Sequence, residues 1–125
     1  MYAMKLIRRS FVISIAVAFC WLVSSQTSSA HAILVEATPS PNSKVAGPNI
    51  AIKLRFNSRI DPDRSRLTLV LKDGTTRKLE IQKQQSADTL TSQITDLGSG
   101  ACTLRWQVLA TDGHITRGEF VFEIV

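Results

Sequence analysis

Two histidines occur in this 125-residue sequence, and both stand where they could bind a metal ion. His31 follows a segment typical of a removable secretory leader, so we expect it to become the first residue of the mature chain. A histidine in that position offers two nitrogens, the α-amine and the ring nitrogen nearer the backbone, which can close a chelate ring on one ion. The amine has a pKa near 8, so a metal can displace its proton at neutral pH.

The second histidine follows an acidic residue and a glycine in Asp112-Gly113-His114. Side chains at positions i and i+2 of an extended segment point the same way, and Gly113 permits a turn. We therefore expect the carboxylate and the imidazole to converge. With His31 they make three nitrogens and one oxygen without sulfur, a set that favours Cu(II) over Cu(I). Zinc remains the competitor, since histidine and aspartate also bind it, but it prefers a tetrahedron.

All but one of the sulfur-containing residues lie in the leader. Both methionines, Met1 and Met4, lie there, as does Cys20, so Cys102 is the one sulfur-containing residue of the expected mature chain. This composition excludes a Met-rich Cu(I) site and an intramolecular disulfide. We predict that Cys102, at the start of an expected strand, is a buried core residue and not a ligand.

Residues 1–30 have the three zones of a signal peptide, which are basic over 1–9, apolar over 11–23 and small and polar over 24–30. The apolar run is shorter than the roughly 20 residues that span a bilayer, although an uncleaved anchor helix stays open as the alternative. Cleavage after Ala30 exposes His31, whereas cleavage after Ala32 removes it. We favour cleavage after Ala30.

Residues 31–125 are enough for one domain with a single modest core. Three of the fifteen Lys and Arg residues lie in the leader and all ten Asp and Glu residues follow it, so the mature chain is only weakly basic. No basic cluster interleaves with aromatic residues, which argues against a nucleic-acid interface. The interspersed charges do not indicate an anionic membrane surface either.

Apolar residues alternate with polar ones at a period of two, which predicts half-buried strands. Asp73-Gly74 predicts a two-residue hairpin turn with positive φ values, and Trp106 is predicted to be buried beside Leu104 and Val108. The pattern indicates an all-β fold, a seven-stranded antiparallel Greek-key sandwich of immunoglobulin-like architecture, with a cupredoxin-like barrel as the near alternative. The expected strands cover residues 32–36, 50–56, 67–71, 76–81, 89–94, 104–108 and 119–124, and punctuated links cover 38–43, 47–49, 61–63 and 96–100.

The mature region resembles the CopC family of periplasmic copper-binding proteins along its whole length. The likeness is carried by His31-Ala32, Thr38-Pro39, a strand ending in Phe56, and the stretch from Leu104 through Asp112-Gly113-His114 to Phe122. The resemblance implies one Cu(II) per mature chain in a histidine brace, with His31 giving its amine and ring nitrogen, His114 an imidazole and Asp112 a carboxylate. It also implies export to the periplasm and a role either in copper tolerance or in copper uptake with an inner-membrane partner of the CopD type. We expect a monomer.

Two departures narrow this expectation to the Cu(II)-only members of the family. Many relatives place a glutamate two residues after the strand phenylalanine, where this chain has Ser58, and the Met-rich loop of the Cu(I)-binding members is missing. We expect a copper carrier or sequestering protein in copper homeostasis or resistance, and not an enzyme. The alternatives are a metal-free adhesion or assembly module and a histidine-brace copper oxidase or monooxygenase.

Overall fold

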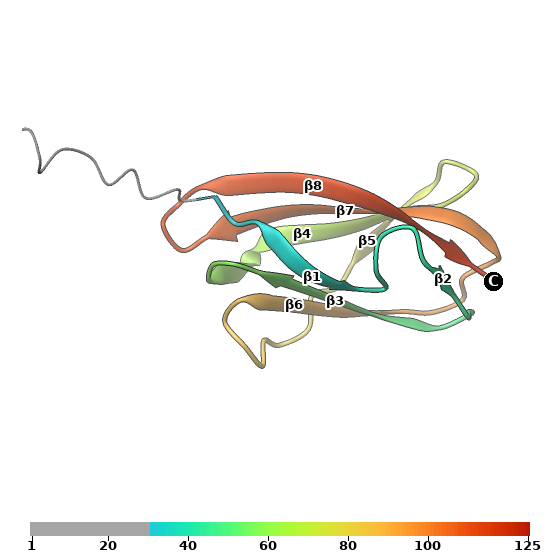
Figure 1. Cartoon of the computed structure of the whole chain (residues 1–125), viewed down its shortest axis with the longest axis horizontal. Coiled ribbons are helices and arrows are strands. Elements are labelled where there is room, and N and C mark those ends of the chain that lie inside the picture. Colours follow the sequence, from blue (N-terminus) through green and yellow to red (C-terminus); the bar gives the residue numbers. More distant parts are fainter. Residues whose placement is uncertain (1–30) are drawn as a thin grey trace, which may run out of the picture.

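The computed structural model describes residues 31–125, which form two β-sheets (Figure 1). One sheet has three strands in the order β1-β3-β6, and the other has five in the order β2-β8-β7-β4-β5. The predicted leader and its cleavage site at Ala30 lie outside the described residues. The strands are β1 (Leu34–Thr38), β2 (Lys44–Val45), β3 (Ile50–Phe56), β4 (Ile60–Val70), β5 (Thr76–Leu79), β6 (Thr89–Ile94), β7 (Gly100–Ala110) and β8 (Ile115–Ile124).

The prediction of an all-β sandwich is confirmed, and all seven expected strands are present. The eighth strand, β2, is an addition of two residues that pairs in parallel with the end of β8, opposite Glu123 and Ile124. The other strand pairs are antiparallel. Along residues 31–125 there is no helix with the length and apolar character needed to cross a membrane.

Strand β4 is longer than predicted, because the Asp-Pro-Asp segment expected to be a link lies inside it. Its pairing with β7 is irregular between Asp61 and Arg66. Pro62 lies in this irregular stretch, where its missing N–H interrupts no regular ladder. The hydroxyl of Ser65 donates a hydrogen bond to the Asp61 carbonyl at 2.6 Å and accepts one from a β7 backbone N–H at 3.1 Å, which ties the irregular part to the sheet.

The predicted alternation places one face of each long strand in the core between the sheets. In β3 every second residue from Ile50 to Phe56 is buried and the residues between them are exposed. Trp106 departs from the prediction, because its indole is only half-buried against the edge of the core. It packs across Gly118 of β8, which lacks a full neighbouring strand at this point because β2 pairs only with the end of β8. The largest fully buried side chains are Phe56, Phe122, Ile52, Leu54, Leu67, Leu69, Leu90, Leu104, Ile124 and Val108.

The connection between β4 and β5 closes with a backbone hydrogen bond between Leu71 and Thr75 around three residues, 72–74, so the prediction of a two-residue turn is wrong. Of Asp73 and Gly74, only the glycine has positive φ, at 87°. The N–H of Gly74 donates to the Leu71 carbonyl at 2.9 Å, and the N–H of Leu71 donates to the Thr75 carbonyl at 2.8 Å. This pattern is typical of a common hairpin type, in which a tight turn is followed by a residue in the left-handed conformation, here Gly74, that forms a β-bulge.

Candidate metal centre

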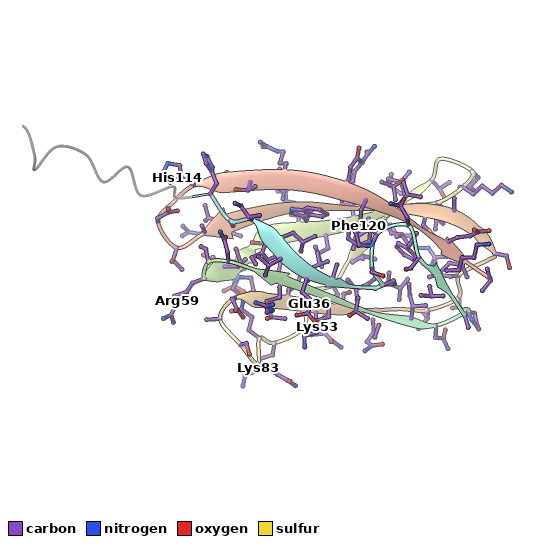
Figure 2. The ribbon with its side chains drawn as sticks, in the orientation of Figure 1. Glu36, Lys53, Arg59, Lys83, His114 and Phe120 are labelled. Atoms are coloured by element: carbon purple, nitrogen blue, oxygen red, sulfur yellow. The ribbon has the colours of Figure 1, made fainter. Side chains whose placement is uncertain are left out.

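The structure brings His31 and His114 together at one end of the sandwich. His31 stands just before β1 in the three-stranded sheet. His114, which Figure 2 labels, ends the turn between β7 and β8 in the five-stranded sheet. Their ring centres are 5.7 Å apart with an interplanar angle of 73°. Because a metal–imidazole bond is about 2.0–2.1 Å long, two rings at this separation can each direct one nitrogen at a single ion.

Asp112 is held beside His114 by the geometry of its turn. The N–H of Gly113 donates to the Ala110 carbonyl at 2.9 Å, and the N–H of Ala110 donates to the His114 carbonyl at 2.9 Å. Gly113 has φ 92°, which glycine adopts without strain. The expected convergence of Asp112 and His114 is found, but a tight turn produces it and not an extended segment.

Asp112 contacts both the backbone and the ring of His114 through one carboxylate oxygen. Oδ1 accepts the backbone N–H of His114 at 3.0 Å and lies 3.3 Å from His114 Nδ1. The hydrogen bond from the His114 backbone N–H lowers the pKa of Asp112 below its usual 3.8, so the carboxylate is charged at neutral pH. The carboxylate of Asp112 and the imidazole of His114 therefore lie side by side at the end of this turn.

The site is open to solvent. The side chains of His114 and Asp112 are 56% and 41% exposed. An ion can therefore reach them without any opening of the core, and a partner surface can reach a bound ion in the same way.

The chain on the C-terminal side of His31 is anchored by two residues. Ala32 is fully buried in the core. Ile33 makes two hydrogen bonds with Asn57, one to the side-chain oxygen at 2.7 Å and one from the Asn57 N–H at 2.9 Å. Sequence reasoning missed Asn57, because an asparagine directly after a strand is a common turn residue and carries no sign of its distant partner.

The side chains alone do not make a complete metal site. Within residues 31–125, no three or more His, Cys, Asp or Glu side chains are grouped closely enough to hold a metal ion. In the full-length chain the backbone nitrogen of His31 is in the peptide bond to Ala30. An α-amine donor at His31 exists only after cleavage at that bond, so the donor set is incomplete before cleavage.

Cys102 is buried, as predicted, and it lies away from this end of the molecule. Its thiol is free and buried, and its Sγ contacts the Gly100 carbonyl at 3.7 Å. Burial raises the pKa of the Cys102 thiol, which disfavours the thiolate form. Eight residues of strand separate Cys102 from Ala110 at the histidine end, on the order of 26 Å. The thiol therefore belongs to the core.

The fold and the paired histidines define a small β-sandwich with an exposed nitrogen and oxygen donor site at one end. A family model, described as the CopC domain, matches residues 34–125. The chain therefore belongs to the CopC family. A comparison with curated proteins gives no match.

Two solved structures of copper proteins share this fold. CopC from Methylosinus trichosporium OB3b is 29% identical, with a TM-score of 0.68 over 75% of this chain and 93% of the other. PcoC, a methionine-rich copper resistance protein from Escherichia coli, is 22% identical, with a TM-score of 0.63 over 77% of this chain and 100% of the other. The likeness to PcoC supports the fold alone, since the expected mature chain has no methionine.

Proposed function

We propose that the mature form of this chain begins at His31 and binds one Cu(II) ion as an exported carrier or sequestering protein. The ligands are the α-amine and ring nitrogen of His31, the imidazole of His114 and a carboxylate oxygen of Asp112. Copper is the cargo of this site, and the chain carries out no reaction on it. The periplasm is the compartment, in copper homeostasis or resistance.

The approach of His31 to His114 carries the proposal. These two histidines lie 83 positions apart in sequence, yet their ring centres are 5.7 Å apart. In a mature chain that begins at His31, the α-amine and the first imidazole belong to the same residue. Cleavage therefore adds a third nitrogen donor to the two imidazoles. Nitrogen and oxygen donors without sulfur suit Cu(II), which also has the highest affinity among the divalent first-row metals.

Membership of the CopC family supports copper over zinc as the cargo. The exposure of the site suits a protein that receives and releases its ion, because a buried ligand set would hold the ion behind the core. An inner-membrane protein of the CopD type is the partner we propose for this transfer, with the chain itself acting as a monomer.

The proposal is tested by titrating Cu(II) into two proteins, one that begins at His31 and one that carries a single additional alanine before it. The additional residue converts the His31 amine into an amide and leaves both imidazoles in place. We expect the first protein to bind one Cu(II) and the second to bind about 100-fold more weakly or worse, since even outer-shell losses cost 10–100-fold. Equal tight binding by both would rule out the amine as a ligand.

The cleavage site itself is tested by the intact mass of the exported protein. A mass that corresponds to residues 31–125 supports the proposal. A mass that corresponds to a start at Ile33 would show that cleavage removes His31 and leaves one histidine. That result would favour the metal-free adhesion or assembly module.

A further inference from the structure

We infer that Asn57 is a positioning residue for the metal site, because it holds the His31 end of the chain against the turn that carries His114. This inference rests on the proposed function and adds a residue that is not itself a ligand. Asn57 lies directly after β3, in the three-residue connection 57–59 to β4.

Asn57 extends the pairing of β1 and β3 past the point where the regular ladder stops. The last paired residues of that ladder are Leu34 and Phe56. One step further, the Ile33 N–H donates to Oδ1 of Asn57 at 2.7 Å, and the Asn57 N–H donates to the Ile33 carbonyl at 2.9 Å. The side-chain amide thus supplies the acceptor that a strand carbonyl would supply, two residues from His31.

The same connection also holds the other half of the site. The carbonyl of Arg59 accepts a hydrogen bond from the Thr111 N–H at 3.1 Å, at the start of the turn that carries Asp112 and His114. Figure 2 shows Arg59 and His114 at the same end of the molecule. One short connection therefore bonds to the segment before β1 through Asn57 and to the β7–β8 turn through Arg59, and it sets the separation of the two.

Without the Asn57 side chain, the residues before Leu34 would keep one hydrogen bond, from the Asn57 backbone N–H to the Ile33 carbonyl, and the buried methyl group of Ala32. Chain ends are poorly ordered unless something ties them down, and an ion that must order its own ligands binds more weakly than one that meets a prepared site. The hydroxyl of Ser58, the next residue, donates to the Arg59 carbonyl at 3.3 Å and makes no hydrogen bond to the segment before β1 within residues 31–125. The positioning contact thus belongs to Asn57 and not to its neighbour.

The test compares three variants of the mature protein that begins at His31. Asn57→Ala removes the acceptor and keeps the backbone bond, Asn57→Asp keeps an oxygen at that position, and Ser58→Ala is the matched control in the same connection. Hydrogen exchange of the Ile33 amide is measured by NMR without metal, and the Cu(II) affinity is measured by competition with a chelator.

We expect Asn57→Ala to speed exchange of the Ile33 amide and to weaken Cu(II) binding, each about five- to tenfold, in keeping with the net value of one hydrogen bond. Asn57→Asp should restore the protection of the amide, and Ser58→Ala should change neither quantity. The melting temperatures of the variants are compared so that a general loss of fold is recognised.

The outcomes separate this inference from the proposed function. Unchanged amide exchange in Asn57→Ala would overturn the inference, whatever the protein binds. Faster exchange with unchanged Cu(II) affinity would also overturn it, while the Cu(II) site would stand. If the unaltered protein bound no Cu(II), the proposed function would fail and the role of Asn57 at a metal site would fail with it, even if the amide lost its protection.

Discussion

At the residue scale, Asp112 and Asp73 occupy equivalent positions in two turns of the same kind. In each turn a glycine with positive φ follows the aspartate, and Oδ1 of the aspartate accepts the N–H of the residue after the glycine, at 3.0 Å from His114 and 2.9 Å from Thr75. The Thr75 hydroxyl and N–H lower the pKa of Asp73, and the His114 N–H lowers that of Asp112. The orientation of Asp112 therefore follows from ordinary turn chemistry, and the histidine after it makes the turn a candidate metal site.

This equivalence gives a matched pair of variants. Asp112→Asn and Asp73→Asn each keep an Oδ1 acceptor for the turn and remove one negative charge. We expect Asp112→Asn to weaken Cu(II) binding by about 10–100-fold or more, because it removes the charge of a proposed ligand and even the loss of an outer-shell partner costs that much. Asp73→Asn, at the opposite end of the sheet, should leave the affinity unchanged.

Cu(II) titration of the two proteins with the native His31 terminus checks this prediction. Thermal melts should show similar small changes for both variants, since each turn keeps its acceptor. Equal effects on Cu(II) affinity from both substitutions would mean that net charge, and not the position of Asp112, governs binding.

At the scale of the elements, strand β8 shows why a half-buried tryptophan accompanies a glycine. Trp106 of β7 lies opposite Gly118 of β8. A Cβ built on Gly118 would lie 2.2 Å from Cζ2 of the indole, closer than any real contact. The indole packs against the glycine and lies near Phe120 and Phe56, with ring centres 5.9 and 6.4 Å away.

Gly118→Ala is expected to destabilise the fold by about 1–3 kcal/mol, the usual cost of overpacking. Gly98→Ala is the control, because nothing lies within 4 Å of the Cβ position there. Urea unfolding followed by tryptophan fluorescence measures both, since Trp106 is the one tryptophan of residues 31–125. A Gly118→Ala protein as stable as the control would show that the indole can move away at no cost.

The elements also show which parts of the structure a sequence can predict. The alternation along β3 predicts its buried face correctly, because a period of two follows directly from strand geometry. The length of β4, the half-exposed Trp106 and the contact between Asn57 and Ile33 could not be predicted in this way. Each of them depends on which strand lies alongside, and that information is set by residues far away in the chain.

The candidate site shows the same division. Asp112 and His114 are neighbours in sequence, so their convergence was predicted from the residues between them. The approach of His31 to His114 required the resemblance to a known family, because periodicity does not determine which strand ends meet. Asn57 escaped both arguments, since its hydrogen bond to Ile33 spans 24 positions in the sequence.

At the scale of the whole molecule, the proposed Cu(II) ion would link the two sheets. His31 leads into the three-stranded sheet, and Asp112 and His114 belong to a turn of the five-stranded sheet (Figure 1). At this end the connection 57–59 already joins the two halves through the 3.1 Å hydrogen bond between Thr111 and Arg59. A bound ion would add a second, stronger connection that exists only in the folded chain, because unfolding separates His31 from His114.

Cu(II) should therefore raise the thermal stability of the mature protein. An ion present at 100 times its dissociation constant stabilises the folded state by about 2.7 kcal/mol if it does not bind the unfolded chain. For a domain of this size, each kcal/mol raises the melting temperature by about 4–8 °C. The His31 amine and ring remain available in the unfolded chain and reduce the effect, so we expect a rise of about 10 °C.

Calorimetric melts with and without Cu(II) measure this rise. A protein with one additional residue before His31 should show a much smaller shift, because its folded state lacks the amine donor. Zn(II) should raise the melting temperature less than Cu(II) at the same concentration, in line with the affinity order of the divalent metals. Equal shifts with and without the additional residue would mean that the His31 amine contributes nothing to the stabilising site.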